Sequence, residues 1–152
     1  MLPKSDDIKI SSDISVYQAS LLQARAHRYL IVIKNRVLNF HKISMMEWII
    51  LGCIYDAGSS GITATQLADR LYRSQSFITA KIKTLESKDF IYRQTNKVDS
   101  RSVIIKFKPK QKQVFMEMEN DIKNLVIDKI YKRISKQDMF TYLNVLQKIV
   151  TD

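Results

Sequence analysis

The chain has 152 residues, of which 45% are hydrophobic, and a formal net charge of +10. This length suits one domain with a sizeable core, and the positive charge favours an anionic partner, either nucleic acid or a membrane surface. An apolar run of about 18 residues, which a membrane-spanning helix needs, is missing from the sequence, so insertion into a membrane is not expected. The single cysteine, Cys53, excludes an internal disulfide and fits a reducing cytoplasm, where we expect the protein to work.

The first two elements expected are helices. Over residues 15–38, apolar side chains recur at three- and four-residue spacing and therefore line one face of a long helix; they are Leu22, Ala26, Tyr29, Ile33 and Val37. Ser44 is suited to cap a second helix that runs to about Asp56. The sequence of that helix, MMEWIILGCIYD, is apolar nearly all round, which predicts that it is buried.

The next segment has the pattern of a helix-turn-helix. After a turn at residues 58–61, Thr63 and Gln66 form a capping-box pattern at the start of a short third helix. Ser74 or Ser76 caps a fourth helix that runs to about Lys88. Its apolar residues lie on one face (Ile78, Ile82 and Leu85), and the outer face is polar and basic. A short helix, a tight turn and a second helix of this kind are typical of DNA-binding proteins.

A hairpin follows directly. Residues 91–94 and 103–107 are rich in β-branched and aromatic side chains, which favour strands, and residues 95–102 form a polar turn between them. Residues 73–112 carry eleven lysines and arginines against three acids, so a net +8 of the chain's +10 lies in this region. A cationic hairpin after a helix indicates a wing that grips a polyanion.

The C-terminal third is expected to be helical again. Pro109 begins a helix that stays regular to about Ile134, and Ser135 caps a last helix whose apolar residues point inward: Phe140, Leu143, Leu146, Ile149 and Val150. The apolar stripes of residues 15–40 and 109–151 exceed what one compact lobe, residues 44–108, requires. They predict a homodimer through these terminal helices, with a monomeric bundle as the alternative.

The stretch LESKDFIYRQTNKVDSRSVIIKFKPK resembles the wing region of the MarR family of transcriptional regulators. The resemblance extends over about residues 15–150, and the positions that carry it are Leu85, Glu86, Ile91, Arg93, Asp99 and Arg101. Two positions depart from the family pattern. Asp89 replaces the usual glycine after the recognition helix, although Asp tolerates a left-handed conformation better than most residues. Phe107-Lys108 replaces Leu-Thr, so a helix start at Pro109 takes the place of the threonine cap.

The resemblance implies a single domain over residues 1–152: a mainly α protein with a small β-hairpin wing, in which a winged helix-turn-helix is flanked by N- and C-terminal dimerisation helices. It implies a homodimeric regulator of transcription that binds a pseudo-palindromic operator in double-stranded DNA, more often as a repressor than as an activator. It also implies that Arg101 enters or borders the minor groove, with Asp99 orienting it through a charge-assisted pair. The alternatives are a non-specific nucleoid-type DNA binder and a protein-interaction module on the same fold.

The candidate DNA-binding residues are Thr63, Thr65, Gln66, Arg73, Ser74, Gln75, Ser76, Thr79, Lys81, Lys83, Lys97, Asp99 and Arg101. Gln, Ser and Thr can read bases, whereas the lysines are better suited to phosphates. The alternative is that Thr63 and Gln66 only cap a helix and that the cations are solvated. Tyr17, Tyr29, Met45 and Trp48 either line a pocket for a small-molecule effector or belong to the core, the more frequent outcome.

Other chemistry finds little support in the sequence. Cys53 lies among apolar neighbours and is expected to be an inert buried thiol rather than a redox sensor. One cysteine and two histidines, without a His/Glu pair one helical turn apart, predict neither a metal site nor a cofactor. Catalytic pairs and a glycine-rich phosphate loop are also missing, so we do not expect an enzyme.

Overall fold

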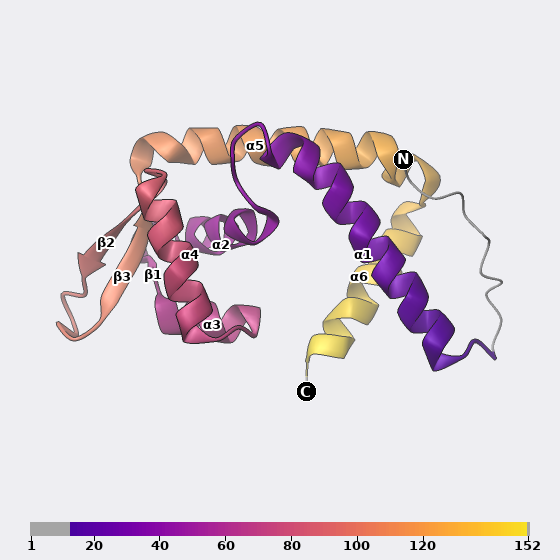
Figure 1. The fold of residues 1–152 in the computed structure, drawn as a ribbon, viewed down its shortest axis with the longest axis horizontal. Helices are drawn as coiled ribbons and strands as arrows, with labels where there is room; N and C mark the ends of the chain where they lie inside the picture. The colour runs from indigo at the N-terminus through magenta and orange to yellow at the C-terminus, as the bar shows by residue number, and fades with distance from the viewer. Residues whose placement is uncertain (1–12, 152) are drawn as a thin grey trace.

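The structure, a computed structural model, describes residues 13–151. Of the single domain expected over residues 1–152, residues 1–12 and 152 lie outside the described part. Two regions are joined by one long helix, α5 (Pro109–Lys129), which runs along one side of the molecule (Figure 1). At one end of α5 lies a winged-helix lobe, and at the other lie α1 (Val16–Leu38) and α6 (Lys136–Val150). No helix among residues 13–151 is long and apolar enough to cross a membrane.

The second and third helices begin at the predicted caps, Ser44 and Thr63, and the first begins at a cap that was not predicted, Ser15. Ser15 and Ser44 cap α1 and α2 (Met45–Asp56), and Thr63 caps α3 (Ala64–Leu71). Each cap is a reciprocal box in which the side chain three residues on, Gln18, Glu47 or Gln66, bonds back to the backbone of the cap. A cap of this kind is worth about 1 kcal/mol, so three of them determine these boundaries largely from local sequence.

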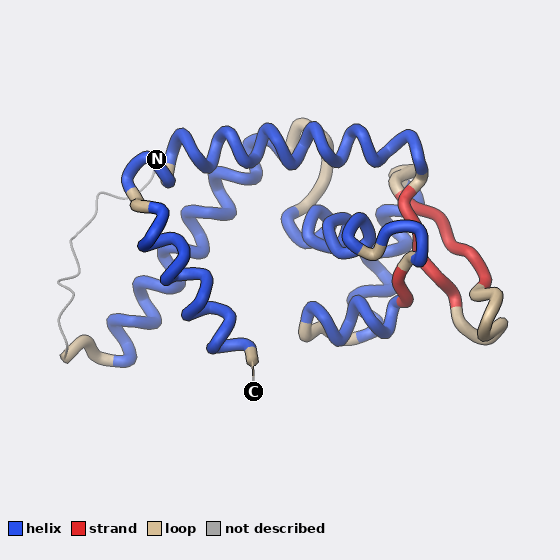
Figure 2. The backbone as a smooth tube through the Cα atoms, turned by 180° about the vertical axis from the view of Figure 1, so that it is seen from behind, coloured by secondary structure: helices blue, strands red, loops and turns tan. Residues whose placement is uncertain are grey.

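The sheet is one strand larger than the expected hairpin. β2 (Ile91–Thr95) and β3 (Val103–Phe107) pair antiparallel, with Ile91 opposite Phe107. A two-residue strand, β1 (Ile62–Thr63), adds to the other edge of β3 and places Ile62 opposite Ile105, giving the order β1-β3-β2. Figure 2 shows the hairpin extending from the lobe beyond the helices. Two residues are too few for a recognisable strand pattern, which is why sequence reasoning missed β1.

Gly61 permits this third strand. Its φ of 71° is left-handed, and a Cβ at this position would come within 2.8 Å of the carbonyl oxygen of Ile105. A 3-10 turn, η1 (Gly58–Ser60), precedes it and delivers the chain to β1. The close approach of two backbones therefore requires glycine here.

The core lies in the winged-helix lobe and extends under α5. The recognition helix α4 (Gln75–Ser87) buries Ile78, Ile82 and Leu85, as the sequence predicts. Ile33 and Leu38 of α1 belong to the same cluster. From α5, one apolar stripe joins it (Phe115, Met118, Ile122 and Val126). The long helix thus packs against the lobe, where Phe115 contacts the rings of Tyr55 and Phe107, and along α1.

Two expectations about the C-terminal third are wrong. α5 begins at Pro109 as predicted but ends at Lys129, and a 3-10 turn, η2 (Tyr131–Arg133), replaces its expected continuation to Ile134. None of the described residues of α6 is buried in the single chain. The five residues expected to point inward are 40–64% exposed: Phe140, Leu143, Leu146, Ile149 and Val150. On α1, Ala26 of the predicted apolar stripe is exposed in the single chain.

Candidate nucleic-acid interface

Helices α3 and α4 form the predicted helix-turn-helix. Tyr72, with a left-handed φ of 49°, ends α3, and Ser74 caps α4 by accepting a hydrogen bond from the backbone N–H of Phe77. On α4, one face is buried, and the opposite face exposes Gln75, Ser76, Thr79 and Lys83 to solvent. The predicted outer face of the recognition helix is therefore confirmed in its geometry, with a row of short polar side chains ahead of Lys83.

The first turns of α3 and α4 are joined by side-chain hydrogen bonds. Gln75 Nε2 donates to Thr65 Oγ1 at 2.9 Å, and the hydroxyls of Ser74 and Ser76 lie 3.2 Å apart. Together these four exposed side chains form one polar cluster at the N-terminus of α4. Since Gln75 bridges two helices, its amide is held in a defined orientation before any ligand arrives.

Thr63 and Gln66 cap α3, whereas Thr65 bonds to Gln75 of α4. Both complete the capping box of α3: Thr63 Oγ1 accepts from the Gln66 N–H at 3.2 Å, and Gln66 Oε1 accepts from the Thr63 N–H at 2.9 Å. The capping role weighed for these two residues is the one observed. Arg73 lies over the ring of Phe77, with 5.5 Å between the guanidinium carbon and the ring centroid, and stays exposed at the start of α4.

Lys81 does not lie on the outer face. Its ammonium nitrogen is 3.6 Å from the Oε1 atom of Glu47 on α2, and only 28% of its side chain is exposed. Lys88, at the end of the same helix, lies 2.8 Å from the other oxygen of Glu47. Because Lys81 is engaged on the inner side of α4, it leaves the set of groups available to bind phosphate, whereas Lys83 remains in that set.

The wing is an ordered turn. Asn96 Oδ1 accepts from the Val98 N–H, and Asn96 Nδ2 donates to Ser102 Oγ, closing the turn across its base. Asp99 Oδ1 accepts from the backbone N–H of Arg101 at 3.0 Å, and the carbonyl oxygen of Asp99 accepts from Ser102. Asn96 and Ser102 were not singled out by sequence reasoning, although an Asn at the start of a turn is a recognisable signal.

The expected ion pair between Asp99 and Arg101 is absent among the described residues. Asp99 bonds to the backbone of Arg101 and leaves its guanidinium exposed, together with Lys97, at the tip of the wing. The reason is local geometry: an Asx turn places the carboxylate beneath the N–H two residues on, so that the arginine side chain projects away.

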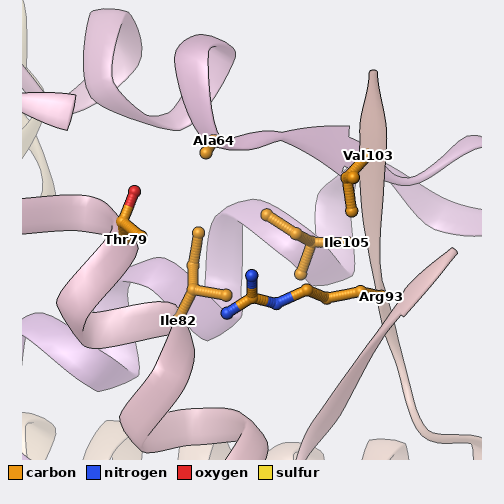
Figure 3. A pocket seen from close by; sticks show the side chains of 6 residues that line it. All are labelled: Ala64, Thr79, Ile82, Arg93, Val103 and Ile105. Carbon is orange, nitrogen blue, oxygen red and sulfur yellow. The ribbon is translucent and has the colours of Figure 1, made fainter. Parts of the chain in front are cut away.

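Arg93 connects the wing to the recognition helix. Its Nε atom donates to Glu86 Oε2 of α4 at 3.0 Å. Figure 3 shows the Arg93 side chain extending from β2 towards Ile82 of α4, over a small cavity of about 60 Å³ that Val103 and Ile105 also line. The hairpin and α4 are thereby held to each other by an ion pair.

Asp89, which replaces the family's usual glycine, adopts the left-handed conformation that this position requires, with a φ of 67°. Its carboxylate forms an ion pair with Lys108, which occupies the N-cap position of α5 without a capping hydrogen bond from its side chain. The two departures from the family pattern therefore interact with each other. Both lie where β2 and β3 meet the helices, away from the exposed face of α4.

A larger cavity of about 450 Å³ lies between α1, α5 and α6. Of the four residues considered for an effector pocket, Tyr29 lines it; Tyr17 is exposed, and Met45 and Trp48 pack against the core. Sequence reasoning missed Lys34, which also lines the cavity. Its Nζ atom lies 5.4 Å from the ring centroid of Trp48.

Two titratable groups in this part of the molecule are perturbed. Burial lowers the pKa of Lys34, against an opposing effect of the Glu119 charge. Burial raises the pKa of the Cys53 thiol, which supports the expectation of an inert core cysteine. The charge of Arg70 lowers the pKa of the thiol but does not outweigh the effect of burial.

Comparison with known proteins identifies the lobe. Residues 43–103 match the MarR family. The chain is 25% identical over 109 residues to the HTH-type transcriptional regulator SarU of Staphylococcus aureus. The aligned segment covers 72% of this chain and 42% of that protein. It thus spans less than half the length of this relative. This relative is named as a regulator of transcription, in keeping with the expectation that the chain is not an enzyme.

Solved structures show the same fold. The transcriptional regulator BldR from Sulfolobus solfataricus superposes with a TM-score of 0.73 at 25% identity, covering 90% of this chain and 100% of that one. CouR from Rhodococcus jostii RHA1, bound to p-coumaroyl-CoA, gives a TM-score of 0.79 at 14% identity over 91% and 95% of the two chains. A mutant of S. aureus MepR bound to an oligodeoxyribonucleotide gives 0.60 at 20% identity over 90% and 97%. These likenesses confirm the mainly α winged helix-turn-helix fold.

Proposed function

Since residues 43–103 match the MarR family, we propose that this chain is a homodimeric transcriptional regulator that binds a pseudo-palindromic operator in double-stranded DNA. The observation that carries the proposal is the joint exposure of a polar recognition helix and an ordered cationic wing, Arg93 and Glu86 holding the two together. The net +8 of residues 73–112 supplies the attraction to phosphate. Such a protein works where the chromosome lies, which in a bacterium or archaeon is the cytoplasm.

In this proposal α4 enters the major groove. Gln75, Ser76 and Thr79 lie on its exposed face and meet base edges, while Thr65 fixes the Gln75 amide. Arg73 and Lys83 flank them and contact phosphates, together with the α3 N-terminus at Thr63 and Gln66. The wing brings Arg101 and Lys97 to the adjacent minor groove, where the negative potential favours arginine.

The dimer is proposed from the terminal helices. α6 exposes a continuous apolar face that includes Leu143, Leu146 and Ile149, and the N-terminal end of α1 exposes Val16 and Tyr17. A second copy of the chain is the occupant that fits, because two-fold symmetry pairs these faces and duplicates the recognition helix at once. Half-sites are then expected about one helical turn, roughly 10 bp, apart.

We propose repression rather than activation, because a protein bound through α4 and the wing would occupy DNA that the transcription machinery needs. A reporter gene placed behind the selected operator should therefore be expressed more strongly when the protein is deleted.

The cavity between α1, α5 and α6 is the place where we propose that a small-molecule effector binds. Lys34 offers a cation within a largely apolar lining that includes Tyr29 and Tyr142, which favours an anion with an aromatic or acyl body. One structural neighbour, CouR, was crystallised with p-coumaroyl-CoA. Weakened operator binding on addition of such an anion, abolished in Lys34→Met, would support this role.

The experiment that tests the proposal is selection of bound duplexes from a random DNA pool at fixed, near-physiological salt, because phosphate contacts make affinity steeply salt-dependent. Enrichment of one inverted repeat supports the dimeric, sequence-reading regulator. Binding without enrichment overturns it in favour of a non-specific nucleoid-type binder, and no binding at all favours a protein-interaction module.

A further inference from the structure

Glu47 is the one polar or charged residue among the described residues that is buried, with 3% of its surface exposed. It lies in the first turn of α2, on the side that faces the recognition helix. Removing a carboxylate from water is costly unless other groups compensate it. Because Glu47 faces the inner side of α4, the exposed face of that helix does not account for the burial of this carboxylate.

The two carboxylate oxygens of Glu47 join three segments of the chain. Oε2 accepts from the Ser44 N–H at 2.9 Å and from Lys88 Nζ at 2.8 Å, while Oε1 lies 3.6 Å from Lys81 Nζ. Lys88 Nζ also donates to the carbonyl oxygen of Lys42 at 2.7 Å. The connection after α1, the start of α2 and the C-terminal half of α4 thus meet at this carboxylate.

Helix capping alone does not require a carboxylate here. Among residues 13–151, the other two capping boxes, at Ser15 and Thr63, use Gln18 and Gln66 at the equivalent position, and both glutamines are exposed. A glutamine oxygen satisfies the backbone N–H of the cap as well as a carboxylate oxygen does. The negative charge at position 47 therefore serves the two lysines of α4.

The connection between α1 and α2, to which Lys88 donates a hydrogen bond, has an unusual backbone conformation. Lys42 has a left-handed φ of 55°, a conformation that costs energy for a residue other than glycine, and its carbonyl oxygen points to Lys88. α1, which leads into this connection, packs along α5. The end of the recognition helix is in this way bonded to the segment that follows a proposed dimerisation helix.

We propose that Glu47, acting through Lys81 and Lys88, is a positioning residue that sets the orientation of the recognition helix relative to the α1–α2 connection. This inference rests on the proposed function, since correct orientation is what a dimer needs to place two α4 helices in successive major grooves. Because replacing a buried ion pair by apolar residues is often neutral for stability, we assign these ion pairs a role in arrangement rather than in net stability. Glu47 itself contacts no DNA.

Glu47→Gln is the variant that separates the two roles of this side chain. Glutamine keeps the capping bond to Ser44, as Gln18 and Gln66 do at their helices, but cannot form ion pairs with Lys81 and Lys88. We expect operator affinity to fall about tenfold or more, while affinity for unrelated DNA changes less than about twofold. Both are measured well below the melting temperature, so that a loss of stability alone would leave them unchanged.

Asp128→Asn is the matched control. Asp128 is also one carboxylate between two lysines, Lys129 and Lys132, but it lies exposed on α5, away from the lobe. We expect its operator affinity to equal that of the wild type. Equal affinity of Glu47→Gln and the wild type for operator would overturn the positioning role, as would a loss of equal size for operator and unrelated DNA.

Lys88→Met provides a second route if Glu47→Gln does not fold. It keeps the aliphatic stem, removes the bonds to Glu47 and Lys42, and should also lower operator affinity selectively. If both variants fold, the double variant should lose little more than either alone, because one interaction is being removed twice. Fully additive losses would contradict the proposal. Failure of the wild type to select any operator would refute the proposed function instead.

Hydrogen exchange supplies a readout that needs no DNA. If Glu47 positions α4, Glu47→Gln should speed amide exchange in α4 and in residues 42–44 while leaving α5 as in the wild type. Unchanged exchange in α4 would overturn the inference even if the protein proved to bind something other than DNA.

Discussion

The carboxylate of Asp99 accepts a hydrogen bond from the backbone N–H of Arg101, with 3.0 Å between Oδ1 and the nitrogen, so that Asp99 shapes the wing while the Arg101 guanidinium remains exposed. The two residues therefore have separable roles: one determines the turn, and the other is available to a ligand. This separation leads to two different experiments on neighbouring positions.

Arg101→Ala should weaken operator binding by about 1–3 kcal/mol, because a cation proposed for the minor groove is lost. Its side chain is exposed, so the melting temperature should stay within about 2 °C of the wild type. Fluorescence anisotropy at fixed salt and thermal melting by circular dichroism measure the two quantities. Unchanged affinity would remove the wing from the interface.

Asp99→Asn and Asp99→Ala should differ. Asparagine retains an oxygen that can accept from the Arg101 N–H, so Asp99→Asn should bind operator nearly as the wild type does. Alanine removes the acceptor, loosens the turn and should reduce affinity severalfold. If Asp99→Asn were instead as weak as Asp99→Ala, the charge of Asp99 would be what matters, and a side-chain pair with Arg101 would form on DNA.

Gly61→Ala should lower the free energy of unfolding by about 1–3 kcal/mol, because the position combines a left-handed φ with a close approach to the Ile105 carbonyl oxygen. Gly52→Ala is the control: it lies within α2, where an added Cβ would meet only the ring of Phe115 at 3.8 Å. There the higher helix propensity of alanine should raise stability by up to about 1 kcal/mol. Urea denaturation compares the two variants, and a Gly61→Ala as stable as the wild type would contradict the β1 assignment.

Leu143→Asp should convert the proposed dimer to monomer. The leucine lies on the exposed apolar face of α6, and a carboxylate buried at a two-fold interface would meet its own copy or an apolar surface. Sedimentation velocity at micromolar concentration measures the change. Thr141→Asp, an exposed position two residues away and so on another side of the helix, should remain dimeric. A dimer in both variants would place the interface elsewhere.

Asp128 should titrate with a pKa of about 2, compared with an ordinary value of 3.8, because hydrogen bonds from Lys132 and Lys129 favour its charged form. A depressed carboxyl pKa means that its stabilising effect is fully present above the ordinary value and is lost as the pH falls from 3.8 towards 2. NMR titration of the side-chain carboxyl carbon measures the pKa. Lys132→Met should raise it, and an unaltered value in that variant would contradict the assignment of the cause.

The sequence by itself determined the elements whose causes are local. Ser15, Ser44 and Thr63 start three helices because capping depends on residues three positions apart. The hairpin at residues 91–107 and the helix start at Pro109 follow from neighbouring residue types in the same way. The resemblance to the MarR family rests on such a local stretch, and it was sufficient to anticipate the fold.

Tertiary structure alone decided which side chains meet across long separations. Lys81 was expected on the outer face of α4, but Glu47, distant in sequence, draws it inward. Lys34 was not expected in the cavity, and Leu143, expected to point inward, is exposed in the single chain. Helical periodicity reveals that a residue lies on an apolar or a charged face, but it carries no information about which other segment covers that face. That choice depends on how α2, α4 and α5 pack in three dimensions, which is why the buried carboxylate beneath the recognition helix became visible only in the folded chain.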